Sequence, residues 1–356
     1  MPTLFFYPWI SVAAPVSLGE IELVPYVRGS QPAAMDGMSL ADIDAVLANY
    51  GVPAFRPETV PALPVSTATL ARFPGDDAAS LLTDEMVHER LRLARLVAFC
   101  CVTARPIGAH LGYCNADTLT VIAQRFSAGN PSGIAISTRR RDGHTQTGLS
   151  GSLPGPRFVR PLHVDHRATF KIDEALFAAL SSVTDPELKS RLEDATELYL
   201  LANTDSSQVP ERAELVMLRA AFETLLQSGH TTDKLVDGFR DHFAGELPEP
   251  PVWHAGVFDE AAWRGRWPKK VTRPFDAWVQ DFCDARNRAA HGLTGHLDSL
   301  WSRENHLLFA SWLLPLVVKG LLARAGAHIL NEDDKLLRAG VEAFFSRNLL
   351  AFDEEN

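Results

Sequence analysis

Residues 275–295 read FDAWVQDFCDARNRAAHGLTG, and this stretch decides how we interpret the second half of the chain. Its apolar residues recur at the spacing of one helix face: Trp278, Phe282, Ala285 and Ala289. A proline at position 274 suits a first helical turn, and Gly292 suits the end of a helix. The spacing therefore predicts an amphipathic helix over 274–291.

The same helical periodicity covers most of the chain after about residue 169. The predicted helices are 172–182, 186–203, 210–228, 232–243, 274–291, 304–325 and 333–349. One long non-helical connection, 244–273, separates the fourth of these helices from the fifth. We therefore predict an all-α helical domain over 169–356.

The first half of the chain has a mixed character. Short runs rich in β-forming residues predict strands at 4–9, 20–27, 133–137 and 158–164. Helices are expected over 39–50, 84–102 and 115–126, and a polar turn region over 138–151. We therefore predict an α+β domain over 1–168, followed by the all-α helical bundle.

Composition narrows the functional classes. The 356 residues are 46% hydrophobic and 22% charged, which is ordinary for a globular protein and excludes a disordered, collagen-like or disulfide-scaffold chain. The formal net charge of −10 excludes a bulk electrostatic DNA binder. Any contact with nucleic acid must therefore use a local basic patch.

The sequence also favours a cytoplasmic protein without a membrane span. None of the four cysteines forms a CxxC pair, so they are interpreted as reduced thiols. The N-terminus lacks the basic region of a signal peptide. The apolar run 307–318 is much shorter than the roughly 20 residues that a membrane helix needs, so we interpret it as a core helix.

Arg286, Asn287 and His291 lie at the end of the predicted 274–291 helix. Asn287 and His291 are four positions apart and so share a helix face. Arg286 lies five positions before His291, an angle of about 140° that a long side chain can cover. The helix C-terminus favours a protonated imidazole. These residues could bind a phosphate, but a solvated helix end is the commoner explanation of an arbitrary Arg-x4-His spacing.

The context of this motif resembles the HEPN superfamily, whose signature is Arg-Asn-x3-His at the end of one helix in a small bundle. An earlier predicted helix contains LRAAFETLL at 218–226. This stretch looks like the helix that carries Glu in the large Apea-like branch of the superfamily. The resemblance covers about half of the chain and implies an HEPN-like bundle over 169–356.

Active HEPN proteins are metal-independent ribonucleases that work as dimers, with the Arg and His of each protomer in a shared cleft. The resemblance therefore implies that Arg286 and His291 are catalytic and that Asn287 orients His291. Glu223 would lie near Arg286 and hold its guanidinium by a bidentate pair; otherwise it is a surface residue. Arg288 is an extra cation that departs from the signature, and it is included as a supporting residue.

The resemblance further implies an endoribonuclease that makes a 2′,3′-cyclic phosphate without a cofactor. HEPN families of this kind are linked to phage defence and toxin–antitoxin systems. The expected protein is thus a toxin or abortive-infection effector, regulated by a phage-derived trigger or an antitoxin at its N-terminal domain. The alternative is a non-catalytic HEPN module for dimerisation or for binding RNA or a nucleotide in a defence complex.

Residues 263–273 read WRGRWPKKVTR and contain five cations without an acid. Cations and flat rings together are typical of single-strand nucleic-acid surfaces. The predicted RNA-binding residues are Trp263, Arg264, Arg266, Trp267, Lys269, Lys270 and Arg273. The alternative is a solvated loop whose tryptophans pack onto the bundle.

Two other clusters are given less weight. His163, Asp165 and His166 could bind a metal, but no further cluster at metal spacing accompanies them, so no metal site is predicted. The run Arg139–Arg141 is interpreted as a solvated loop. The P-loop, nucleophile-elbow and zincin motifs do not occur in the sequence.

Overall fold

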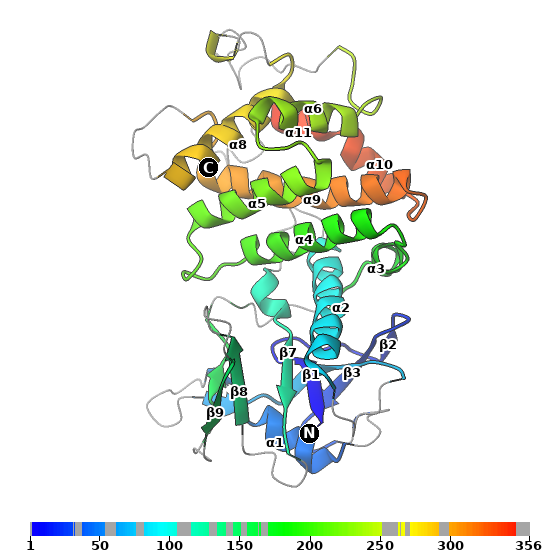
Figure 1. Ribbon diagram of the computed structural model, residues 1–356, viewed down its shortest axis with the longest axis vertical. Helices are drawn as coiled ribbons and strands as arrows, with labels where there is room; N and C mark the ends of the chain where they lie inside the picture. The colour runs from blue at the N-terminus through cyan, green and yellow to red at the C-terminus, as the bar shows by residue number, and fades with distance from the viewer. Residues whose placement is uncertain are drawn as a thin grey trace, which may run out of the picture. The chain divides into compact units, whose positions relative to one another are not determined.

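The computed structural model contains two compact units, 1–178 and 179–356, which are described separately (Figure 1). Sequence patterns placed the division after residue 168. The structure describes residues 2–30, 32, 38–53, 62–75, 82–104, 115–127, 134–139, 145–150, 155–162, 164, 170–250, 263, 265–267, 271–291 and 299–346, with the backbone alone at 134–139 and 145–150.

The first unit is built on a five-stranded antiparallel sheet in the order β2-β3-β6-β1-β7. The strands are β1 (Thr3–Tyr7), β2 (Val16–Ser17), β3 (Glu22–Val27), β6 (Thr67–Arg72) and β7 (Ile122–Arg125). Phe6 of β1 pairs in register with Leu70 of β6 on one side and with Ile122 of β7 on the other. Every residue of β1 is buried, which suits a strand inside the sheet.

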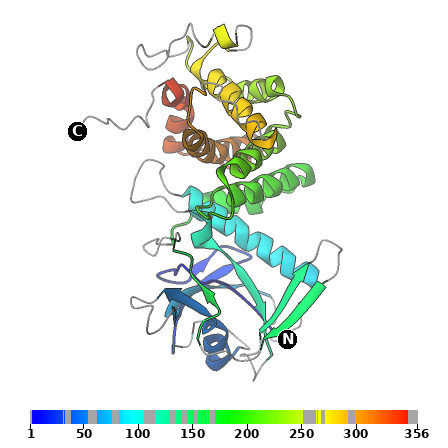
Figure 2. The same cartoon turned by 90° about the vertical axis from the view of Figure 1, so that its left-hand side faces the viewer.

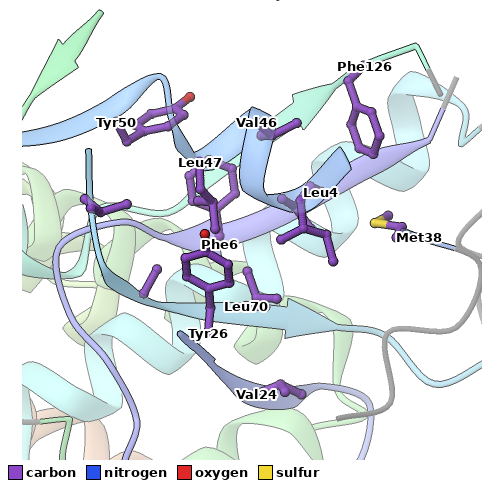
Figure 3. Packing of buried hydrophobic residues seen from close by; sticks show 13 residues of the cluster. Leu4, Phe6, Val24, Tyr26, Met38, Val46, Leu47, Tyr50, Leu70 and Phe126 are labelled. Carbon is purple, nitrogen blue, oxygen red and sulfur yellow. The ribbon is translucent and has the colours of Figure 1, made fainter. Parts of the chain in front are cut away.

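Alternate residues of β1 face two different helices. On one face, Leu4 and Phe6 pack with Val46 and Leu47 of α1 (Leu40–Leu47), as Figure 3 shows. On the other face, the hydroxyl of Tyr7 donates a 2.8 Å hydrogen bond to the carbonyl of Ala94 in α2 (Asp84–Thr103). This period of two lets one short apolar strand contribute to both layers of the core.

Two further pieces of β-structure complete the description of this unit. A small sheet has the order β10-β4-β5, and β8 pairs with β9 as an antiparallel hairpin. Their bounds are β4 (Tyr50–Pro53), β5 (Ala62–Pro64), β8 (Ile134–Arg139), β9 (Thr145–Ser150) and β10 (Phe158–Val159). The predicted turn region 138–151 therefore contains a strand, and the strand predicted to reach residue 164 stops at Val159.

The predicted helix over 115–126 is wrong. Asn115 caps only a single 3-10 turn, η1 (Ala116–Leu119), and β7 follows at once. Gln124 of β7 is buried and accepts a 2.8 Å hydrogen bond from the hydroxyl of Tyr50. Pairing with β1 satisfies the backbone of this segment, so tertiary context overrides its helical pattern.

The second unit is mostly helical, as the sequence predicts (Figures 1 and 2). Its helices are α4 (Pro186–Ala202), α5 (Glu211–Leu226), α6 (Thr232–His242), α8 (Pro274–His291), α9 (Arg303–Arg324), α10 (Glu332–Ala339) and α11 (Val341–Ser346), and α3 (Glu174–Ser181) contains the division between the units. The single helix predicted over 333–349 is two helices that meet at Gly340 within the described part of this segment.

Aromatic side chains join α8 to its neighbours. Phe282 meets Phe222 of α5 at 6.2 Å between ring centroids, and Trp278 stacks on Phe345 of α11 at 4.6 Å. Trp278 and Phe282 are fully buried, which confirms the predicted packing of the apolar stripe at these positions. These contacts anchor the helix to the bundle up to its last two turns.

Helix α9 is long and apolar enough to cross a membrane by length and composition. However, 67% of its apolar window is buried inside the structure, and a mostly buried core helix meets the same criteria of length and composition.

Candidate functional site

The predicted motif occupies the last two turns of α8. Every residue from Pro274 to Cys283 is buried, whereas Arg286, Asn287 and Arg288 are half-buried and His291 is exposed. The helix therefore leaves the core and reaches the surface at the motif. An imidazole at this end is open to solvent and to a ligand.

A residue of α5, Arg219, contacts the motif directly. Its guanidinium Nη1 donates a 2.8 Å hydrogen bond to Oδ1 of Asn287. Its Nε donates at 2.9 Å to Oε1 of Glu223, and its Nη2 donates at 3.2 Å to the carbonyl of His230. Sequence reasoning missed Arg219. The i,i+4 spacing of Arg219 and Glu223 was the signal that could have suggested an ion pair on this helix.

The side-chain oxygen of Asn287 accepts hydrogen bonds from two guanidinium groups. Arg286 Nη1 donates a 3.2 Å hydrogen bond to Asn287 Oδ1, beside the bond from Arg219. Two cationic donors identify this atom as the carboxamide oxygen, so the amide nitrogen is the other end of the group. The orientation of Asn287 is therefore determined by its contacts.

Glu223 belongs to this network, but not in the predicted way. We expected it to hold the guanidinium of Arg286, whereas its carboxylate pairs with Arg219. The alternative of a surface glutamate is also wrong, because only 14% of its side chain is exposed. The four-residue spacing on one helix brings Glu223 to Arg219, and Arg219 in turn reaches Asn287.

Two guanidinium nitrogens in the motif are enclosed without an acceptor. These atoms, Arg286 Nε and Arg288 Nη1, have no hydrogen-bond partner within the described part of the chain. Enclosed cationic donors are costly to leave unpaired. The motif therefore carries two guanidinium donors that the described residues leave unpaired.

The preceding turn of α8 carries buried polar residues as well. Oδ2 of Asp281 accepts hydrogen bonds from the hydroxyl of Ser299 at 2.8 Å and from the backbone N–H groups of Leu300 and Trp301. His306 Nε2 lies 3.2 Å from the same oxygen. Burial would raise the pKa of Asp281, but the hydrogen bonds from His306, Ser299 and Trp301 and the charge of His306 together outweigh it, so the pKa is lowered. This carboxylate anchors 299–301 to α8.

Two other groups on this part of α8 have shifted pKa values. Burial raises the pKa of the Cys283 thiol to about 11, so this cysteine is an inert core residue. Burial also raises the pKa of Asp284, against the opposing effect of Arg266. Neither group supplies a nucleophile to the motif.

The tryptophans of the predicted RNA-binding segment are buried. Trp263 is 1% exposed and Trp267 is 9% exposed. An enclosed ring has no free face on which a base could stack, so the base-stacking role predicted for Trp263 and Trp267 is corrected to core packing. This matches the alternative that both rings pack onto the bundle.

The described arginines of the same segment contact carboxylates. Arg266 Nη2 lies 3.4 Å from Asp281 and 3.6 Å from Asp284, and Arg273 pairs with Glu249 at 2.8 Å. Ion pairs with the protein neutralise charges that the RNA-binding prediction assigned to phosphates. The remaining predicted residues, Arg264, Lys269 and Lys270, lie outside the described residues.

The other clusters singled out in the sequence lie wholly or partly outside the described residues. His163, Asp165 and His166 lie outside the described residues, as do Arg140 and Arg141, and only the backbone of Arg139 is described. Within the described ranges, no group of three His, Cys, Asp or Glu side chains could hold a metal ion.

No protein-family model, curated protein or solved structure matches this chain. Function must therefore be argued from the geometry at the end of α8.

Proposed function

We propose that this protein is a metal-independent endoribonuclease of the HEPN type, with its active site at the end of α8. One observation supports the proposal best: an exposed His291 follows Arg286 and Asn287, whose side chains are joined to a buried network. A solvated helix end would not require a buried arginine and its glutamate behind the motif.

His291 acts as the acid–base group. It takes a proton from the ribose 2′-hydroxyl and returns one to the leaving 5′-oxygen, giving a 2′,3′-cyclic phosphate and a 5′-hydroxyl. An imidazole suits both roles near neutral pH. Arg286 stabilises the charge that develops on the phosphorus oxygens. Arg288 adds a second guanidinium beside this charge.

The active form is a homodimer in the cytoplasm. One motif has a single His and a single Arg, whereas this transesterification gains from two positioned proton-transfer groups. Pairing two copies around the ends of α8 supplies both in one isologous interface. The N-terminal unit receives the controlling signal, a phage-derived trigger or an antitoxin, because an unregulated ribonuclease is toxic to its own cell.

The test is incubation of purified protein with total RNA in EDTA. We expect cleavage by the parent chain and loss of cleavage on the order of 10²-fold or more in His291→Ala and Arg286→Ala. His88→Ala is the matched control, because His88 is an exposed helical histidine in the first unit. Circular dichroism should show that all variants are folded.

The outcomes separate the enzyme from the non-catalytic module. A His291→Ala protein that cleaves RNA like the parent would contradict the active-site assignment. A parent that binds RNA but never cleaves it would favour the binding module. Cleavage that disappears in EDTA and returns with Mn²⁺ or Mg²⁺ would point to a different site.

A further inference from the structure

We propose that Arg219 is a positioning residue for the α8 motif, acting through the carboxamide of Asn287. The inference deepens the proposed ribonuclease function and rests on it. Arg219 would touch no substrate; it would set the orientation of Asn287, and Asn287 would in turn hold Arg286 for a phosphate.

Arg219 is buried, so its guanidinium needs hydrogen-bond partners within the protein. Its residue exposure is only 2%, and a buried charge is tolerated only when it is paired and hydrogen-bonded. Each of its three guanidinium nitrogens has an acceptor: Glu223, Asn287 and the carbonyl of His230. These acceptors lie on α5, on α8 and between α5 and α6. The guanidinium plane is therefore held from three directions.

The side-chain oxygen of Asn287 connects Arg219 to the motif. Arg219 and Arg286 both donate to Oδ1, at 2.8 and 3.2 Å. The amide nitrogen must then point away from both cations, on a residue four positions before His291. Without Arg219, the carboxamide would lose its stronger donor and could rotate.

The charges at this site also support a positioning role for Arg219. Arg219 and Arg286 contribute two positive charges to the hydrogen-bonded network, and Glu223 contributes one negative charge. Because Glu223 is held by Arg219, it does not neutralise Arg286. Loss of Arg219 would free this carboxylate to compete with a substrate phosphate for Arg286.

Substitution separates this role from a purely structural one. Arg219→Gln should lower the kcat for cleavage of a short RNA by about 10²-fold, the scale of a misplacement of about 1 Å, with KM changed much less. Arg219→Lys should recover only part of the rate, because an ammonium cannot reproduce a planar three-way contact.

A double-mutant cycle with Asn287→Ala is the decisive experiment. If Arg219 acts through Asn287, then Arg219→Gln should cost less than about twofold in kcat in the Asn287→Ala background. Equal losses in both backgrounds would overturn the inference. Arg303→Gln is the control, since it breaks an exposed ion pair with Glu211 of α5 and should leave kcat unchanged.

A second measurement does not depend on activity. The side-chain amide signals of Asn287 in a 15N spectrum, assigned from Asn287→Ala, should shift in Arg219→Gln and remain in place in Arg303→Gln. Unmoved signals would overturn the inference. If the signals shift but the parent cleaves no RNA, the contact stands and the proposed ribonuclease function fails.

Discussion

The indole ring of Trp263 packs edge-on against that of Trp301, with centroids 5.5 Å apart and planes inclined by 65°. Both residues are almost completely buried. Trp301 also donates its backbone N–H to Asp281 of α8. A segment that composition suggested as an RNA-binding loop is therefore attached, at its first residue, to the core beside the motif.

Trp263→Ala should destabilise the protein by about 3–5 kcal/mol, because it removes a large buried ring and leaves a cavity. Urea denaturation measures the loss, and Trp263→Phe should lose less because it keeps an aromatic ring. If Trp263→Ala is as stable as the parent yet binds RNA more weakly, the base-stacking interpretation returns.

Gly320 of α9 has no room for a side chain. A Cβ atom there would come within 2.6 Å of His242 Nε2 and would also clash with Arg338. Arg338 is buried, and its guanidinium donates to both carboxylate oxygens of Glu246. The hydrogen bonds of Arg338 therefore depend on a glycine at this position.

We expect Gly320→Ala to lower the free energy of unfolding by about 1–3 kcal/mol, the usual cost of overpacking. Gly265→Ala is the control, because a Cβ atom at Gly265 would meet nothing within 4 Å. Denaturant titration of both variants makes the comparison. Equal stability of Gly320→Ala and the parent would show that α9 and α10 can move apart without cost.

Glu342 of α11 is a buried carboxylic acid that lies beside the first turn of α8. Burial raises its pKa to about 7, and Asp276 and Glu249 act in the same direction. The backbone N–H of Phe275 donates to it at 3.2 Å, and Arg273 lies 3.6 Å away, and both of these contacts oppose the rise. The protonated form is thus favoured in the folded state at mildly acidic pH.

This pKa predicts a pH dependence of stability. Glu342 releases its proton near pH 4.5 in the unfolded chain and near pH 7 in the folded chain. Its contribution to the free energy of unfolding is therefore full below pH 4.5 and is lost as pH rises through 7. The loss is about 3 kcal/mol. Glu342→Gln should gain stability relative to the parent by about this amount between pH 4.5 and 8.

Denaturation of the parent and of Glu342→Gln across this pH range measures the difference in their stability. Titratable groups that both proteins share contribute equally and cancel. Glu332→Gln, which replaces an exposed glutamate on α10, controls for the loss of a negative charge. A parent-to-variant difference that does not change with pH would mean that Glu342 ionises alike in the folded and unfolded chains.

We predict a homodimer in solution, paired through the ends of α8. Light scattering or sedimentation should give twice the 39.1 kDa mass of the chain. Activity per mole should fall when the protein is diluted below its dimer dissociation constant, because each cleft then lacks the second motif. A strictly monomeric protein that still cleaves RNA at high dilution would contradict the shared cleft.

Local patterns predicted the helices of the second unit well. The 274–291 helix was predicted with its observed ends, since a first-turn proline and an apolar stripe act within the segment itself. The first unit was predicted less completely. Strand β6 was missed, although it lies between β1 and β3, because the apolar content of a short strand reflects partners far along the chain.

The sequence by itself determined the helix that carries Arg286, Asn287 and His291, because helical periodicity and end signals are local. Only the tertiary structure decided which groups surround that helix. The spacing of Arg219 and Glu223 allowed an ion pair but could not show that it reaches Asn287 across two packed helices. Composition alone likewise could not distinguish tryptophans that bind RNA from Trp263 and Trp267, which fill a core. Burial is a property of the packed chain: a side chain's exposure depends on residues distant in sequence, and those contacts form only on folding.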